Sequence, residues 1–196
     1  MARETIAVDA DDVLAAHIEE FVAHSNKYYG TNLTPEDYTE RWGVLWGVDD
    51  EEVGRRASEF HKPEIVGNFG VIEEAELVLR ALKRSRELVV VTARAKHITD
   101  TTSEWIERHF PGVFSETHFV PIWEPGNTLT KADICRHIGA SYLIDDLVRH
   151  CIVAAEAGIQ PVLFRRIGWD QGESPHPKVV QVNNWQEVLE YFDGRG

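Results

Sequence analysis

Two carboxylates lie two residues apart directly after the first apolar run of the chain. Asp9 and Asp11 follow residues 6–8, whose sequence is Ile-Ala-Val. Such a short apolar run is typical of a buried strand, and α/β sheets bind ligands at the carboxyl ends of their strands. Carboxylates clustered there repel one another unless a cation neutralises them, and Mg²⁺ prefers oxygen ligands. The pair therefore indicates a magnesium site; the alternative is two acidic turn residues.

Further polar residues follow later apolar runs. Thr92 ends a run of Leu and Val, Asp145 and Asp146 follow another run, and Lys131 begins an expected helix. Because parallel strands end at one edge of a sheet, we expect these groups beside Asp9. A hydroxyl, an ammonium and carboxylates around one metal ion suit phosphoryl transfer, since they position and neutralise phosphoryl oxygens. Taken singly, they could be a helix cap, a solvated lysine and an acidic turn.

Strands and helices alternate along the chain after about residue 72. The expected strands are 6–8, 88–91, 118–122, 142–144, 161–164 and 179–182. The expected helices are 71–83, 98–110, 131–138, one that ends at Gly158, and 185–192. This alternation predicts an α/β fold with a parallel sheet and helices on both faces.

The interval between the first two core strands exceeds what a simple crossover needs. Asp9 and Thr92 are 83 residues apart, whereas a βαβ unit takes about 30 residues. The surplus contains three helical stretches, at 13–29, 34–46 and 49–61. We therefore expect a core of residues 1–15 and 72–196 and a small helical cap of residues 16–71 beside the strand-end carboxylates. The alternative is an insertion without a functional role.

The charge balance excludes several classes of partner. The 196 residues include 20 Lys and Arg against 33 Asp and Glu, a net charge of −13. This charge repels long nucleic acids and anionic membranes, and no apolar run approaches the ~18–20 residues of a membrane span. Cys135 and Cys151 lack metal-ligand spacing and no signal peptide is recognisable, so we expect reduced thiols and a cytoplasmic protein. The sequence leaves open whether the chain forms a homodimer.

The four motifs together resemble the haloacid dehalogenase (HAD) superfamily of phosphohydrolases. The match rests on Asp9-Ala10-Asp11, Thr92, Lys131 and Asp145-Asp146, in the order of that family. The context of Thr92, and the place of the cap, is more narrowly similar to the 5′(3′)-deoxyribonucleotidase-like group. The resemblance implies a Rossmann-like HAD core with a cap inserted after the first strand.

The resemblance also implies a mechanism. Asp9 would attack phosphorus and form an aspartyl-phosphate, which divides the hydrolysis into two easier steps. Asp11 would protonate the leaving oxygen and later take a proton from water. Thr92 and Lys131 would hold the phosphoryl oxygens.

A Mg²⁺ cofactor is part of the same expectation. Its ligands would be Asp9, the backbone carbonyl of Asp11 and Asp146, with Asp145 holding a metal-bound water. Two positions depart from the family pattern. Asp12 stands where a glycine is usual, and either points into solvent or adjusts metal affinity. His150 stands where an acid is frequent, and is either a surface residue or replaces a hydrogen bond to a metal-bound water.

The expected substrate is a small phosphorylated metabolite such as a (deoxy)nucleoside monophosphate. Alternatives are a sugar phosphate or another small ester, a receiver-like phospho-signalling domain, and a non-catalytic binding protein. Cap aromatics could stack on a base or form the cap's own core, and Arg94 could bind phosphate or pair with an acidic helix. The expected substrate-binding residues are Thr92, Ala93, Arg94, Lys131, Trp42 and Trp46.

Overall fold

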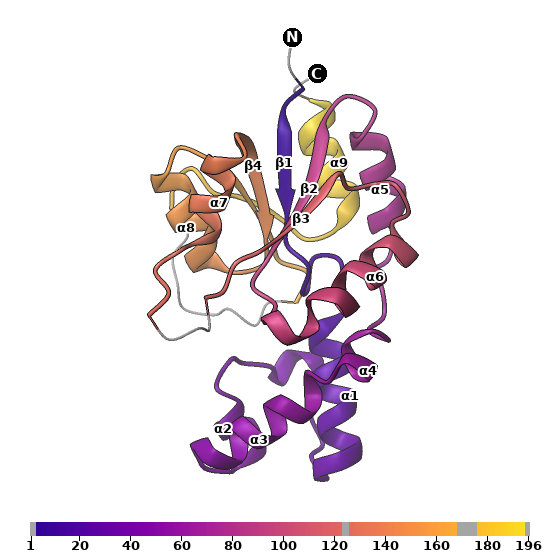
Figure 1. Ribbon diagram of the computed structural model, residues 1–196, viewed down its shortest axis with the longest axis vertical. Helices are drawn as coiled ribbons and strands as arrows, with labels where there is room; N and C mark the ends of the chain where they lie inside the picture. Colours follow the sequence, from indigo (N-terminus) through magenta and orange to yellow (C-terminus); the bar gives the residue numbers. More distant parts are fainter. Residues whose placement is uncertain (1–2, 123–125, 168–175, 195–196) are drawn as a thin grey trace.

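Within residues 3–122, 126–167 and 176–194, which the computed structural model describes, six parallel strands form a central sheet (Figure 1). Their order is β3-β2-β1-β4-β5-β6, and every neighbouring pair is parallel. This order is that of a Rossmann-like sheet, in which the strand order reverses beside β1. The predicted fold class is therefore confirmed. The strands are β1 Thr5–Val8, β2 Glu87–Thr92, β3 Glu116–Phe119, β4 Ala140–Asp145, β5 Gln160–Phe164 and β6 Val180–Val182.

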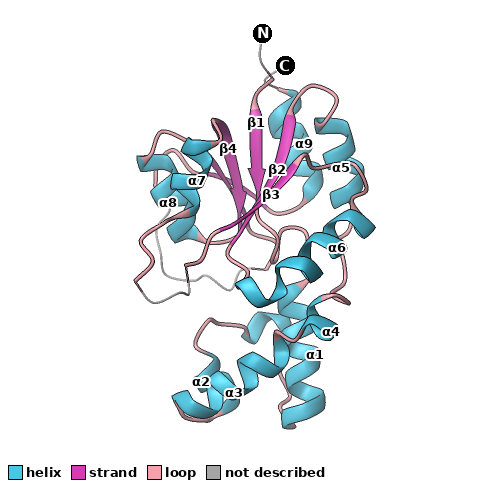
Figure 2. Cartoon of the chain, in the orientation of Figure 1, coloured by secondary structure: helices cyan, strands magenta, loops and turns pink. Residues whose placement is uncertain are grey.

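Helices cover both faces of the sheet, because successive strand residues point to opposite sides. Ile6 and Val8 of β1 pack in a cluster with α5, α6 and α9, whereas Ala7 packs in a second cluster with α7 and α8. The two layers flank the strands in Figure 2. The helices are α5 Ala75–Leu82, α6 Thr99–His109 after the 3₁₀ turn η2 Lys96–Ile98, α7 Lys131–His137, α8 Val148–Glu156 and α9 Trp185–Asp193.

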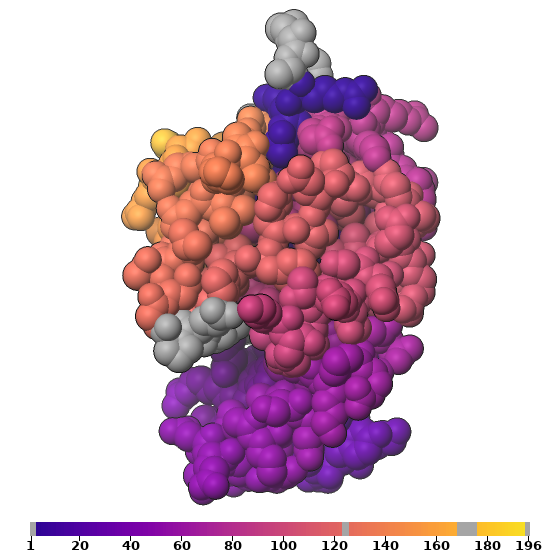
Figure 3. Space-filling view, viewed as in Figure 1, coloured from indigo at the N-terminus to yellow at the C-terminus, as the bar shows by residue number. Residues whose placement is uncertain are grey.

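The chain between β1 and β2 is largely helical and extends beyond the carboxyl end of the sheet (Figure 1). We call its helical segments between His17 and Val66 the cap helices. In space-filling view they form the lower part of the molecule, next to a hollow below the core (Figure 3). The predicted limits of the cap, residues 16–71, stay a prediction. The cap helices are α1 His17–Tyr29, η1 Pro35–Asp37, α2 Trp42–Trp46, α3 Asp50–Phe60 and α4 Pro63–Val66.

Aromatic rings hold the cap helices together. The ring of Phe21 on α1 lies 5.2 Å from Tyr38, 4.6 Å from Trp42, 5.2 Å from Trp46 and 5.7 Å from Phe60, between ring centroids. Aromatic pairs at these separations add about 0.5–1.5 kcal/mol beyond the burial of their area. Helices α2 and α3, too short to be stable alone, and the residue after η1 are thereby fixed against α1.

The start of α1 differs from the sequence prediction. The helix begins at His17, four residues later than expected, because Asp12 has a left-handed backbone with φ of 56°. The Asp12 carboxylate accepts a hydrogen bond from the Ile18 N–H at 2.9 Å, which satisfies a free donor of the first turn. Ala15 then forms a bridge with Val71, so that α5 also starts later than expected.

Other boundaries moved less. The stretch expected over 34–46 is divided, because Tyr38 has an extended backbone after η1. Strand β3 ends at Phe119, before the expected limit at residue 122. Cys135 and Cys151 are buried free thiols, as predicted. Among the described residues no helix has the length and apolar character needed to cross a membrane.

Candidate active site

The carboxyl edge of the sheet brings four of the predicted site residues together. Asp9 follows β1, Asp145 ends β4, Asp146 comes next in the chain, and Lys131 opens α7. The Lys131 ammonium lies 2.7 Å from Asp9 Oδ2 and 2.8 Å from Asp145 Oδ2. Burial opposes its charge, but Asp145 and Asp9 raise the pKa of Lys131 above its ordinary value. The ammonium is therefore held between two carboxylates.

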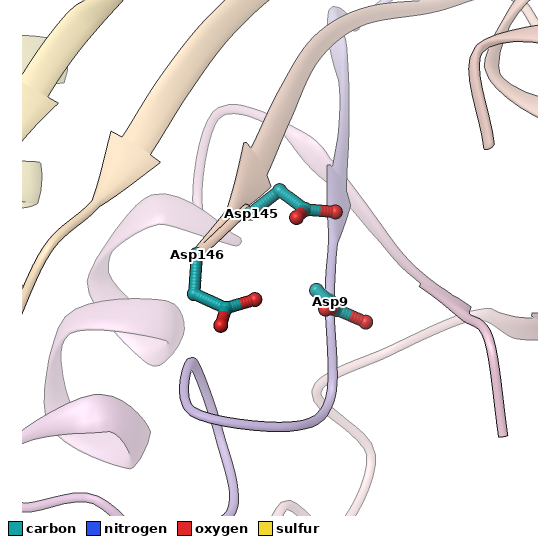
Figure 4. Close-up of side chains that lie close together, drawn as sticks. All are labelled: Asp9, Asp145 and Asp146. Atoms are coloured by element: carbon teal, nitrogen blue, oxygen red, sulfur yellow. The ribbon is translucent and has the colours of Figure 1, made fainter. Parts of the chain in front are cut away.

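Three buried carboxylates surround one space at this edge (Figure 4). Oxygens of Asp9, Asp145 and Asp146 lie within 4.8 Å of one another. Burial, partly offset by Lys131, raises the pKa of Asp9 to about 6, and burial with the neighbouring charge of Asp145 raises the pKa of Asp146 well above its usual range. One ammonium does not balance three carboxylates, so this oxygen set fits a hard divalent cation.

The two adjacent acids differ in their partners. Asp145 accepts hydrogen bonds from Lys131 and from the Leu147 N–H. Burial opposes its ionisation, but Lys131 and then His150 hold the pKa of Asp145 below its usual range. In contrast, the Asp146 carboxylate accepts no hydrogen bond from the residues that the structure describes. Asp146 therefore has its oxygens available to a ligand.

Asp11 forms an ion pair that its sequence position did not predict. The Arg94 Nη2 lies 2.7 Å from Asp11 Oδ1, and Arg94 Nε lies 3.1 Å from Oδ2. Although burial raises the pKa of Asp11, Arg94 and then His17 hold it below the usual range. Arg94 is buried and also donates to Thr102 Oγ1 at 3.3 Å. The acid that Arg94 contacts lies in the loop after β1 and not in a helix, and the predicted binding of phosphate by Arg94 stays a prediction.

Thr92 ends β2 and is fully buried. Its hydroxyl oxygen accepts a hydrogen bond from the Arg94 N–H at 3.3 Å. Thr92 is not among the residues that line the neighbouring cavity, whereas Ala93, Arg94 and Lys131 are. The hydroxyl is thus close to the acidic edge, but its predicted contact with a phosphoryl group stays a prediction.

A cavity of about 470 Å³ separates the acidic edge from the cap helices. Asp9, Asp11 and Asp146 line its core side, and Tyr38 and Trp42 line its cap side. The volume is within the ~300–1,000 Å³ usual for small-molecule sites. The cavity places polar reactive groups at one end and aromatic surface at the other.

A model of the family 5′ nucleotidase, deoxy (pyrimidine), cytosolic type C protein (NT5C) matches residues 3–192. The chain belongs to this family. The predicted recognition, a HAD-type nucleotidase-like protein, is therefore confirmed, and the protein is a HAD-type phosphatase.

Relatives of this nucleotidase-family chain agree with that assignment. A 5′(3′)-deoxyribonucleotidase of Bacillus subtilis is 25% identical over 192 residues, which are 95% of this chain and 96% of the relative. A haloacid dehalogenase-like protein of Agrobacterium tumefaciens, ATU0790, has the same fold, with a TM-score of 0.69, 15% identity and 99% of each chain covered. The YfnB protein of Bacillus subtilis, solved bound to magnesium, has a TM-score of 0.59 at 12% identity, covering 98% of this chain and all of that one.

Both departures from the family pattern have structural roles in this nucleotidase-family chain. His150 is not a surface residue: its Nδ1 lies 3.1 Å from Asp145 Oδ1, and its side chain is only 14% exposed. Asp12 does not point into solvent: it is buried, caps α1 through Ile18, and its Oδ2 lies 3.6 Å from His17 Nδ1. Buried carboxylates need hydrogen-bond donors. The Ile18 N–H is such a donor for Asp12, and the His150 imidazole contacts the buried carboxylate of Asp145.

The cap contributes residues that sequence reasoning missed, and one expected residue lies elsewhere. His17, Tyr38 and His61 line the cavity of this nucleotidase-family chain. Trp42 also lines the cavity, and its predicted contact with substrate stays a prediction. Trp46 is not among the lining residues: it is buried and donates from Nε1 to Ser25 Oγ at 2.9 Å. Periodicity alone could not separate the two tryptophans, because both belong to one short helix.

Proposed function

We propose that this chain is a Mg²⁺-dependent phosphatase that hydrolyses a nucleoside monophosphate through an aspartyl-phosphate on Asp9. The observation that most supports this is the set of Asp9, its ion pair with Lys131 and two further carboxylates at one end of a cavity of small-molecule size. The 5′(3′)-deoxyribonucleotidase name of a relative that matches 95% of this chain favours a nucleotide.

The proposed chemistry starts at Asp9. A carboxylate oxygen of Asp9 forms a bond to phosphorus while the ester P–O bond breaks, and Asp11 donates a proton to the leaving oxygen. In the second step Asp11 takes a proton from a water that attacks the same phosphorus, the bond between the Asp9 oxygen and phosphorus breaks, and inorganic phosphate leaves the regenerated Asp9 carboxylate. Lys131, at 2.7 Å from Asp9, offsets the charge that would otherwise repel a phosphate dianion.

Arg94 has to move between partners in this scheme. Its ion pair with Asp11 favours the ionised carboxylate, which cannot donate a proton. We propose that the phosphoryl group of the substrate competes for the guanidinium, since Arg binds phosphate oxygens with the same bidentate geometry. Asp11 is then free to carry the proton of the first step, and Thr92 adds a hydroxyl donor beside the phosphoryl oxygens.

The carboxylate cluster would hold the Mg²⁺. Asp9 and Asp146 would bind the ion directly, with the backbone carbonyl of Asp11, and Asp145 would act through a water molecule. The partners of Asp145 support this division, because Lys131, His150 and Leu147 already occupy its oxygens. When bound, the ion supplies charge that neutralises phosphoryl oxygens and holds the reacting groups in place.

A panel of phosphate esters tests this proposal. Wild-type protein with Mg²⁺ is supplied with deoxyribonucleoside and ribonucleoside monophosphates, sugar phosphates and p-nitrophenyl phosphate, and released phosphate is measured. The expected result is the highest kcat/KM for a nucleoside monophosphate. A sugar phosphate that exceeds every nucleotide would refute the substrate while leaving the phosphatase in place. Stable phosphorylation without turnover would favour a receiver-like domain. The absence of any reaction would favour a non-catalytic binding protein.

The two tryptophans of α2 form a matched pair of variants. Trp42→Ala is expected to raise KM for nucleotides roughly 5–100-fold, as expected for the ~1–3 kcal/mol of stacking between a base and an aromatic ring. Trp46→Ala removes a buried ring and its hydrogen bond to Ser25, so we expect a loss of about 3–5 kcal/mol in unfolding free energy instead.

Steady-state kinetics and chemical unfolding of both variants distinguish these effects. Hydrolysis of a sugar phosphate from the same panel should change little in Trp42→Ala, because this ester has no aromatic ring to stack. Equal losses on the nucleotide and the sugar phosphate would show that Trp42 only supports the cap helices.

A further inference from the structure

His61 lies on the cap side of the cavity, one residue beyond the end of α3. Its backbone is fixed at both groups. The N–H donates to the Ala57 carbonyl at 2.9 Å, and the carbonyl lies 3.2 Å from His97 Nε2. The imidazole therefore has a defined place at the cavity wall, on the side opposite the carboxylate cluster.

Aromatic rings also fix the plane of the His61 imidazole. It lies nearly parallel to Trp42, with centroids 5.6 Å apart and planes at 24°, and to His17 at 6.0 Å and 21°. Phe60 packs against it at 5.2 Å. Because other rings contact the faces of the imidazole, its edge is available for polar interactions, and this edge carries both nitrogens.

Four histidines line the cavity, and they differ in the partners of their ring nitrogens. His17 Nδ1 lies beside Asp12, His97 Nε2 beside a carbonyl, and His150 Nδ1 beside Asp145. Neither ring nitrogen of His61 has a hydrogen-bond partner among the described residues. Burial, and then the charge of His17, lower the pKa of His61 to about 4, so the ring is neutral and offers one donor and one acceptor.

Asp11 and Arg94 share this cavity with His61. If Asp11 protonates the leaving oxygen, the carbon skeleton attached to that oxygen has to lie in the cavity between Asp11 and the cap helices. A neutral imidazole edge there is suited to a hydroxyl group, which both donates and accepts hydrogen bonds. An aryl or alkyl group would leave both nitrogens unpaired, which costs binding energy.

We propose that His61 is a specificity-determining residue that hydrogen-bonds a hydroxyl of the leaving group, so that the cavity selects phosphate esters of sugars and nucleosides over aryl phosphates. This inference rests on the proposed phosphatase mechanism and deepens it. For a deoxyribonucleoside 5′-monophosphate, the hydroxyl in question is the 3′-hydroxyl of the sugar.

The variant His61→Phe keeps an aromatic ring in the stack and removes both nitrogens. We expect its KM for a deoxyribonucleoside 5′-monophosphate to rise about 3–10-fold, the effect of one neutral hydrogen bond. The KM for p-nitrophenyl phosphate, which has no hydroxyl, should not rise and is expected to fall, because the variant lacks the nitrogens that this ester leaves unpaired. His137→Phe, on an exposed position of α7, is the matched control and should change neither substrate.

A substrate without the hydroxyl tests the contact from the other side. Wild-type protein should have a kcat/KM about 3–10-fold lower for the 2′,3′-dideoxynucleoside monophosphate than for the deoxynucleotide, whereas His61→Phe should treat the two alike. The wild-type half of this comparison needs no folded variant. Equal discrimination by wild type and variant, or no discrimination by wild type, overturns the proposal.

The outcomes separate this inference from the proposed function. If nucleotides are hydrolysed well and His61→Phe behaves as wild type, the role of His61 is wrong and the nucleotidase proposal stands. If a sugar phosphate is the best substrate, the nucleotide proposal fails, and the same comparison with deoxy analogues of that sugar tests His61. If no ester is hydrolysed, both proposals fail.

Discussion

Replacing Asp9 with Asn is expected to reduce kcat by at least ~10³-fold, a loss of about 4 kcal/mol in transition-state stabilisation. The amide has nearly the shape of the carboxylate and its oxygen can still accept from Lys131, which lies 2.7 Å from Asp9 Oδ2. What the substitution removes is the anion that attacks phosphorus. Phosphate release by wild type and variant, with a nucleoside monophosphate and with p-nitrophenyl phosphate, measures the effect.

Two further measurements make this result specific. Asp100→Asn changes the same charge at an exposed position in the first turn of α6, and should retain wild-type activity. Acid quenching of wild type during turnover, followed by mass spectrometry, should find phosphate on the peptide that contains Asp9. Substantial turnover by a contamination-free Asp9→Asn preparation would sink the covalent mechanism.

The edge that carries the candidate site could be predicted from the sequence because parallel topology leaves little freedom. Once Asp9, Thr92 and Asp145 were assigned to the carboxyl ends of three parallel strands, their common edge followed. The position of Lys131 at this edge could be predicted by the same reasoning, since Lys131 begins the helix that leads into β4. Strand ends are set by local sequence, and the sheet converts local positions into spatial neighbours.

The partners of these residues were not predictable in the same way. Arg94 reaches Asp11 across 83 positions of sequence, and only the folded arrangement brings them to 2.7 Å. Trp42 and Trp46 lie one turn apart in a five-residue helix, and both contact Phe21 of α1, so the helical pattern could not show that only Trp42 lines the cavity. His61 carried no signal at all, because a single histidine after an acidic helix has no distinctive spacing.

Removal of divalent cations is expected to abolish hydrolysis, and added Mg²⁺ to restore it. Asp9, Asp145 and Asp146 bring three buried carboxylates within 4.8 Å, with Lys131 as the cation that contacts two of them. Without a further cation, phosphate would meet a surplus of negative charge at this edge. Activity after EDTA treatment, and after return of Mg²⁺, gives the first measurement.

Binding itself provides a second readout that does not depend on turnover. A ligand that binds only the folded protein adds about 2.7 kcal/mol to unfolding free energy at 100 times its Kd, so Mg²⁺ should raise the Tm of wild type. Asp146→Asn should lose most of this rise, because the Asp146 carboxylate is the one without a protein donor among the described residues. Asp100→Asn, at an exposed position of α6, is the control and should keep it. Full activity in metal-free buffer would contradict the proposed Mg²⁺ requirement. An undiminished Tm rise in Asp146→Asn would contradict the proposed ligand set, because Asp146, the carboxylate without a donor among the described residues, would then not bind the ion.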